Sequence, residues 1–179
     1  MLYTMSYDSP VGRLLLGERE GALAGLWIEG QKYFLGSEKE EIRESKDSVI
    51  LRETTQWLDN YFQGEKPPVS QLKLAPSGSE FRKAVWKLLC DIPYGEVTTY
   101  KEIAQKVAPI LGLSKMSAQA VGGAVSHNPV SIIIPCHRVV GANGSLTGYA
   151  GGLEKKIALL TLEGVEMKHF FVPGKGTAL

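Results

Sequence analysis

The sequence predicts a mixed α+β fold, in which a small antiparallel sheet with one helix precedes a mainly helical region. The first 30 residues alternate short apolar runs with turn-forming residues, which is typical of a β-meander. From Ser77 onward, apolar residues instead recur at the spacing of amphipathic helices. A chain of 179 residues buries roughly 70% of its unfolded surface, so it can form one large domain or two small ones without disulfide bonds.

The N-terminal part is expected to form three strands and a helix. The expected strands are Leu2–Ser6, Leu14–Leu16 and Leu23–Ile28. The helix is expected over residues 49–63, because Ser48 can cap its start and Gly64 can end it. We therefore expect an N-terminal domain over residues 1–68, followed by a linker over residues 69–77.

The second part, residues 78–179, is expected to form a helical domain. Its expected helices are Phe81–Cys90, Tyr100–Val107, Ser117–Ser126 and, at the end, about Gly152–Glu163. Ser77 with Glu80, and Thr99 with Glu102, have the spacing of capping boxes ahead of the first two helices. The short helices that follow one another closely fit a helix-turn-helix, a weak signal when taken alone.

Charge is distributed unevenly along the chain, although the net charge is only +1. Residues 1–79 hold 9 Lys and Arg against 12 Asp and Glu, a balance of −3, whereas residues 80–179 hold 11 against 7, a balance of +4. The basic half favours an anionic partner such as nucleic acid, and a chance distribution is the alternative. No apolar run of about 18 residues and no secretory signal is visible, so we expect a cytoplasmic protein, associated with the nucleoid if prokaryotic.

The chemistry is expected at an apolar run, residues 132–134, that ends in Pro135, Cys136 and His137. Proline fixes its own backbone and favours an extended residue before it, so Cys136 is held in a defined place. A cysteine reacts as the thiolate, and His137 is the obvious acceptor for its proton. Side chains of neighbours in extended structure point to opposite sides, so a bridging water or a local turn would be needed. A purely structural cysteine is the alternative.

Glu163 is the candidate third member of this group. It lies in the last turn of the last expected helix, where a negative charge opposes the helix dipole. There it could orient His137 and stabilise the cationic imidazole, and a solvated surface glutamate is the alternative. The sequence has no dinucleotide-binding or phosphate-binding glycine motif and no zinc-finger spacing, so we expect no cofactor and no metal. The group donor is then the substrate itself.

At this point the residues resemble a known family. The string AVGGAVSHNPVSIIIPCHRVVGANGSLTGYAGG, with FRKAVWKLLCDIPYGEVTTYKEIA before it, is similar to the methylated-DNA–protein-cysteine methyltransferases, also called O6-alkylguanine-DNA alkyltransferases. The resemblance covers about residues 78–166. It implies a ribonuclease H-like first domain, a winged-helix-like second domain with a helix-turn-helix, and a monomer that binds double-stranded DNA. It also implies base flipping, minor-groove binding and irreversible, stoichiometric transfer of the alkyl group from O6-alkylguanine to Cys136. O4-alkylthymine is a further candidate substrate that the sequence leaves open.

The resemblance also implies roles for individual positions. Cys136 matches the alkyl acceptor, His137 and Glu163 match the residues that activate it through a water, and Asn128 matches the asparagine that braces the adjacent turn. The expected substrate-binding and DNA-binding positions are Tyr100, Ala118, Gln119, Arg138, Val139, Tyr149, Ala150 and Lys156. Two of them depart from the usual pattern. Gln119 stands where the family often has an arginine that fills the gap left by the flipped base, and Ala150 replaces a common serine, so any contact there must come from the backbone.

Two other function classes remain open from the sequence. The same Cys, His and Glu could build a hydrolase, which would turn over repeatedly, whereas an alkyltransferase stops after one equivalent. A lesion-binding protein without chemistry is the other class, and the presence of Cys136 argues against it.

Overall fold

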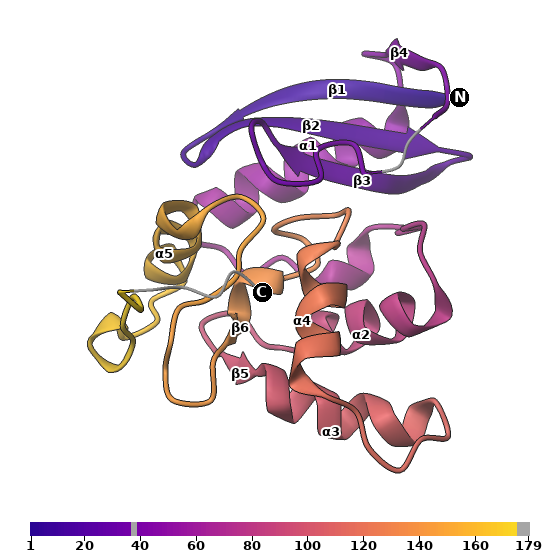
Figure 1. The fold of residues 1–179 in the computed structure, drawn as a ribbon. Helices are drawn as coiled ribbons and strands as arrows, with labels where there is room; N and C mark the ends of the chain where they lie inside the picture. Colours follow the sequence, from indigo (N-terminus) through magenta and orange to yellow (C-terminus); the bar gives the residue numbers. More distant parts are fainter. Residues whose placement is uncertain (37–38, 175–179) are drawn as a thin grey trace. The chain divides into compact units, whose positions relative to one another are not determined.

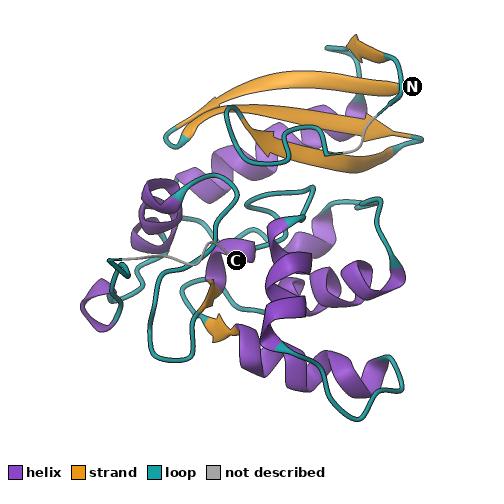
Figure 2. Cartoon of the chain, viewed as in Figure 1, coloured by secondary structure: helices purple, strands orange, loops and turns teal. Residues whose placement is uncertain are grey.

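The computed structural model describes residues 1–36 and 39–174, and the chain forms two compact units. Unit 1 comprises Met1–Ser77 together with Pro129–Ile133, and unit 2 comprises Gly78–Asn128 and the chain from Ile134 on. The long strands belong to unit 1 and most of the helices to unit 2 (Figure 2). The predicted α+β fold class is therefore confirmed.

Unit 1 contains a four-stranded sheet. Strands β1 (Leu2–Ser9), β2 (Gly12–Arg19) and β3 (Ala22–Ile28) form the predicted antiparallel meander. They are longer than predicted, because backbone pairing continues through polar residues as far as Ser9 opposite Gly12. A fourth strand, β4 (Ile42–Glu44), pairs in parallel with β1, which gives the order β3-β2-β1-β4. Its three residues are all exposed, so no hydrophobic pattern predicted it.

Helix α1 (Val49–Phe62) covers one face of this sheet (Figure 1). The Ser48 side chain accepts a hydrogen bond from the Leu51 amide, as expected of an N-cap. The buried face includes Trp57, Leu58 and Tyr61. The predicted start of the helix and its end before Gly64 are confirmed.

The open edge of β3 is occupied by two segments from elsewhere in the chain. The Leu23 amide donates to the Lys73 carbonyl, at 2.8 Å, so the stretch that we expected to be a linker is tied to the sheet. The Leu26 amide likewise donates to Pro129, at 2.8 Å, and the Ser131 amide donates to Leu26, at 2.9 Å. Residues 129–133 therefore belong to the unit 1 sheet, although helices of unit 2 flank them in sequence.

Unit 2 is built from four α-helices with short strands and turns between them. The elements are α2 (Glu80–Cys90), β5 (Thr98–Thr99), α3 (Tyr100–Ile110), α4 (Ala118–Ser126), η2 (Cys136–Arg138), β6 (Val139–Val140), α5 (Leu153–Leu162) and η3 (Met167–His169). The predicted capping box of Thr99 and Glu102 is present at α3. Ser117 caps α4, and Gly164 follows α5 with a φ of 77° in the left-handed region.

The predicted cap of α2 was wrong by two residues. Ser79, not Ser77, accepts from the Arg82 amide. The Ser77 hydroxyl instead accepts a hydrogen bond from Arg19, at 3.0 Å, within unit 1. Ser77 and Glu80 therefore have the spacing of a capping box, but Ser77 does not cap the helix.

Helices α3 and α4 pack against each other and against α2, with residues 111–117 between them, as in a helix-turn-helix (Figure 1). The first turn of α4 is exposed, whereas Val121, Gly122 and Val125 face the core. Among the described helices, none is both long and apolar enough to cross a membrane.

Candidate active site

The short turn η2 carries Cys136, and hydrogen bonds on both sides of it fix its position. The Cys136 amide donates back to the Ile134 carbonyl across Pro135, at 2.8 Å. The Asn128 side chain donates to the same carbonyl, also at 2.8 Å. After the turn, β6 pairs with β5, with Val139 opposite Thr98. The sequence left a bridging water or a local turn open, and the structure contains the turn.

The backbone is strained four residues before the cysteine. Ile132 has a φ of 72°, and the Ile133 amide bonds to the Ser131 carbonyl in a tight three-residue turn. A β-branched residue in the left-handed region costs on the order of 1–3 kcal/mol. The Ile132 side chain is fully buried, so packing in unit 1 holds this conformation in place.

The Cys136 thiol is almost completely enclosed, with 3% of the residue exposed. Burial raises the pKa of Cys136 above its ordinary value. A hydrogen bond from Asn128, the charge of Lys156 and the nearby backbone N–H groups act in the opposite direction. A thiol in this setting stays protonated at rest, so its reaction requires a nearby base.

His137 is the candidate for that base, and its ring is oriented by Glu163. The His137 Nε2 lies 2.7 Å from Glu163 Oε1, and Nδ1 has no hydrogen-bond partner among the described residues. An ionised carboxylate only accepts hydrogen bonds, so we assign the ring proton to Nε2. Nδ1 then presents its lone pair. Glu163 is 5% exposed, which excludes the alternative of a solvated surface glutamate.

Arg138 joins the same cluster from the adjacent position. Its Nε donates to Glu163 Oε2 and its Nη2 to Oε1, both at 2.9 Å, while Nη1 donates to the Ile92 carbonyl at 2.6 Å. Only 7% of Arg138 is exposed. The sequence placed it among the DNA-binding and substrate-binding candidates, whereas the structure commits its guanidinium to an internal ion pair. Its place directly after the Cys-His pair was the one signal for this role.

These contacts set the charges of the cluster. Burial alone would raise the pKa of Glu163, but hydrogen bonds from His137 and Arg138 outweigh it and lower that pKa to about 2. Burial also lowers the pKa of His137, against the opposing effect of Glu163. At neutral pH the cluster therefore contains a carboxylate, a guanidinium and a neutral imidazole.

The loop that follows β6 lies close to the same site. The Tyr100 hydroxyl hydrogen-bonds the Thr147 carbonyl at 3.0 Å, and Lys156 Nζ donates to Thr147 at 2.9 Å and to Val139 at 2.6 Å. Burial lowers the pKa of Lys156 to about 8. The Tyr149 ring meets His137 edge-on, with ring centroids 6.4 Å apart, and its buried hydroxyl has no hydrogen-bond partner in the described chain.

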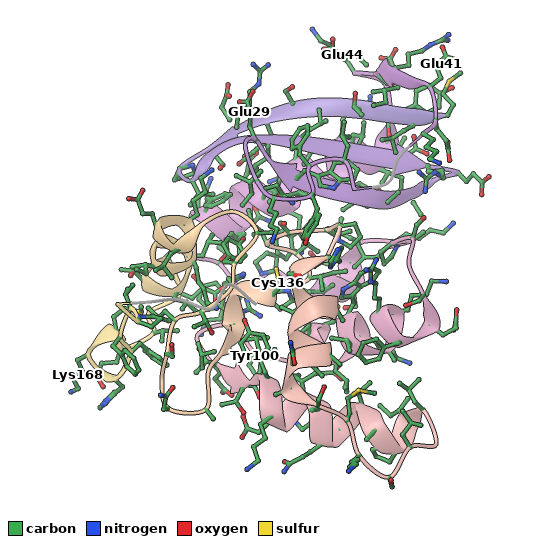
Figure 3. All side chains as sticks on the ribbon, in the orientation of Figure 1. Glu29, Glu41, Glu44, Tyr100, Cys136 and Lys168 are labelled. Atoms are coloured by element: carbon green, nitrogen blue, oxygen red, sulfur yellow. The ribbon has the colours of Figure 1, made fainter. Side chains whose placement is uncertain are left out.

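The structure brings together most of the candidate residues, but not all. Figure 3 labels Cys136 at η2 and Tyr100 at the start of α3, and burial with the charge of Cys136 raises the pKa of Tyr100. Ala150 is half-buried at the end of the loop. Ala118 and Gln119 lie on the exposed first turn of α4, outside this hydrogen-bond network. Within residues 1–36 and 39–174, no group of three His, Cys, Asp or Glu residues could hold a metal ion.

A sheet-and-helix unit followed by a helical unit with a buried cysteine fits one class of protein, the DNA repair methyltransferases that use a protein cysteine. The family model of the 6-O-methylguanine DNA methyltransferase ribonuclease-like domain matches residues 1–76, and that of the DNA-binding domain matches residues 80–165. The chain belongs to the 6-O-methylguanine DNA methyltransferase family. The predicted family and enzyme class are thereby confirmed.

Individual relatives agree over almost their whole length. A methylated-DNA–protein-cysteine methyltransferase of Methanosarcina acetivorans is 43% identical, covering 91% of this chain and 99% of the relative. The enzyme of the same name from Mycobacterium leprae is 40% identical over 91% and 93% of the two chains. The crystal structure of Mycobacterium tuberculosis OGT in complex with DNA is 38% identical, with a TM-score of 0.79 over 90% and 93%.

Proposed function

We propose that this protein repairs O6-alkylguanine in DNA by moving the alkyl group onto Cys136. The observation that carries the proposal is the buried Cys136, followed in η2 by His137, whose Nε2 is held by Glu163 and whose Nδ1 has no hydrogen-bond partner among the described residues. Family membership supports the reaction type, and the DNA-bound structure of the tuberculosis relative supports the partner.

The reaction requires one substitution and two proton transfers, one from the thiol and one to the departing guanine, so that in net the proton of Cys136 ends on guanine. The Cys136 proton passes, through a water, to His137 Nδ1, and the thiolate sulfur attacks the alkyl carbon in line with its bond to O6. That bond breaks and its electron pair remains on guanine, which takes up a proton as it leaves. The product is a thioether, which water does not cleave under mild conditions, so each molecule acts once and needs no cofactor.

A guanine stacked in a duplex cannot reach a buried thiol, so the base must rotate out of the helix. This costs a few kcal/mol, and less for the weakened pair that an alkylated guanine makes. We assign α4 to the minor groove and Gln119, on its exposed first turn, to the gap left by the flipped base. Gln119 can hydrogen-bond there without adding positive charge. O4-alkylthymine has the same kind of alkyl–oxygen bond and is the second candidate substrate.

The flipped base is proposed to enter between the loop after β6 and the start of α3. Tyr100, Tyr149 and Val139 supply the walls, Ala150 supplies backbone, and Lys156 holds the loop through two carbonyls. Unit 2 would then contain both the DNA-binding surface and the acceptor, and we propose that the protein acts as a monomer.

The nucleophile is tested by replacing each cysteine separately. We expect Cys136→Ala to bind duplex DNA that contains O6-methylguanine but to transfer nothing, because the acceptor is lost. Cys90→Ala is the matched control: burial raises the pKa of Cys90 to about 11, so it should be inert, and this variant should repair like the parent. Transfer is measured with radiolabelled methyl DNA. Undiminished repair by Cys136→Ala would refute the proposal, and repeated turnover by the parent would favour a hydrolase.

A further inference from the structure

The Arg138 side chain makes two hydrogen bonds to Glu163, whereas His137 makes one. Each oxygen of the Glu163 carboxylate has at least two donors: Oε1 accepts from His137 Nε2 and Arg138 Nη2, and Oε2 from Arg138 Nε and the Gly95 amide at 3.3 Å. We infer that Arg138 is a positioning residue that fixes the plane and balances the charge of Glu163, so that His137 rests neutral with Nδ1 free to accept the thiol proton. This inference rests on the proposed function.

The two hydrogen bonds from Arg138 Nε and Nη2, here called the fork, determine the orientation of the Glu163 carboxylate. Two parallel N–H···O bonds from a planar guanidinium hold both oxygens in its plane. The third nitrogen, Nη1, donates to the Ile92 carbonyl and thereby anchors the arginine to the turn that follows α2. Gly95 closes the other side. It has a φ of 81°, and a Cβ there would lie 2.9 Å from the Glu163 carbonyl, so only glycine allows this approach. Oε1 is thus directed at His137.

The same contact balances the charge. With the guanidinium in place, Glu163 and Arg138 form a neutral pair, so the carboxylate stabilises an imidazolium less strongly than it would alone. Without it, a single buried negative charge would lie 2.7 Å from Nε2 and would favour a second ring proton on Nδ1. A His137 that is already protonated cannot accept the proton of Cys136.

The other groups that face His137 do not replace Arg138. Lys156 of α5 contributes positive charge, but its ammonium is bonded to Val139 and Thr147 rather than to Glu163. Tyr149, at the edge of the His137 ring, and Tyr94, which stacks near the guanidinium, are neutral hydroxyls at physiological pH, because burial raises the pKa of both. Cys136 itself carries charge only after the proton has left.

The test is the pH dependence of single-turnover methyl transfer with saturating O6-methylguanine duplex. We predict that Arg138→Met moves the acid-side midpoint of the rate upward by about one pH unit, because the loss of a neighbouring positive charge raises the pKa of His137. Arg138→Lys keeps the charge but loses the fork. It should keep the midpoint of the parent and lower the rate severalfold at every pH. Arg43→Met, at an exposed arginine of β4, is the matched control and should match the parent in both respects.

Each outcome decides between the alternatives. A rate that falls equally at all pH values in Arg138→Met, or an unshifted midpoint, would show a merely structural arginine. If Arg138→Met does not fold, Arg138→Lys decides alone: a rate equal to that of the parent, or a moved midpoint, overturns the inference. Failure of the proposed function is recognised separately, because the unmodified protein would then transfer no methyl group at all.

Discussion

At the scale of single residues, Glu163 occupies a position that an isolated helix would disfavour. It is the C-cap of α5, where a negative charge opposes the helix dipole by roughly 0.3–1 kcal/mol. The bidentate pair with Arg138 and the hydrogen bond from His137 offset that cost. Glu163 thus remains a buried carboxylate at a helix end through its contacts with His137 and Arg138.

Replacing Glu163 by glutamine should therefore change stability in a pH-dependent way. The pKa of Glu163 is about 2 in the folded protein against 4.5 ordinarily, so its stabilisation is complete above about pH 5 and is lost as pH falls toward 2. Near pH 6 we expect Glu163→Gln to lose about 3 kcal/mol of unfolding free energy. The difference from the parent should shrink as the pH is lowered.

Urea denaturation at pH 6 and at pH 3 measures that difference. Glu154→Gln, in the exposed first turn of α5, is the control and should cost much less. A loss that is the same at both pH values would show that the lowered pKa of Glu163 contributes nothing to folding.

The sequence pointed to Cys136, His137 and Glu163 as candidates, but it did not predict the pairing of Glu163 with Arg138. Cys136 and His137 stand out because a proline ends an apolar run directly before them, and Glu163 because its charge opposes a helix end. The pairing of Arg138 with Glu163 bridges 25 positions and follows no helix or strand period, so no pattern in the sequence predicted it. The left-handed Ile132 was missed for a related reason, since isoleucine normally indicates extended backbone.

At the scale of elements, α4 carries a glycine that packing does not explain. Gly123 is exposed, and a Cβ built on it would have no atom within 4 Å. Glycine costs a helix interior roughly 1 kcal/mol relative to alanine. Its neighbour Gly122 is buried and faces the core, so close packing is a sufficient reason only for Gly122. Gly123 instead leaves room on the face that we assign to DNA.

We predict that Gly123→Ala stabilises the fold and weakens DNA binding. The unfolding free energy should rise by up to about 1 kcal/mol, because alanine favours the helix and meets nothing. Affinity for duplex DNA should fall severalfold if the backbone of α4 approaches the groove closely. Fluorescence anisotropy with a labelled duplex measures the second effect. Ala158→Gly, on the exposed face of α5, should lower stability by a similar amount and leave affinity unchanged. If Gly123→Ala binds duplex DNA with unchanged affinity, the assignment of α4 to the minor groove is contradicted.

The sequence predicted the helices more accurately than it predicted the strands and their pairing. Three N-caps were predicted, at Ser48, Ser77 and Thr99, and those of α1 and α3 are confirmed, since a cap is a local feature. Ser77 failed because Arg19, distant in sequence, uses its hydroxyl. Strand β4 and the pairing of residues 129–133 with β3 depend on contacts between remote segments, and these leave no periodicity to read.

At the scale of the whole molecule, the two parts of the chain differ in net charge as well as in secondary structure. The acidic balance falls on residues 1–79 and the basic balance on residues 80–179, which include the helix-turn-helix and the cysteine cluster. Attraction to phosphate supplies much of the affinity of such proteins for DNA, and added salt weakens it. This attraction does not depend on the base sequence, so under the proposed function the enclosed site, not the charge, would select the damaged base.

The claim that each protein molecule accepts one alkyl group and is then inactive is tested most directly by the mass of the protein after reaction. We expect that incubation with excess O6-methylguanine duplex adds the mass of one methylene group to every molecule, that peptide mapping places it on Cys136, and that repair then stops at one equivalent. An unchanged protein mass alongside repaired DNA, or an added methyl group on any other residue, would contradict the account.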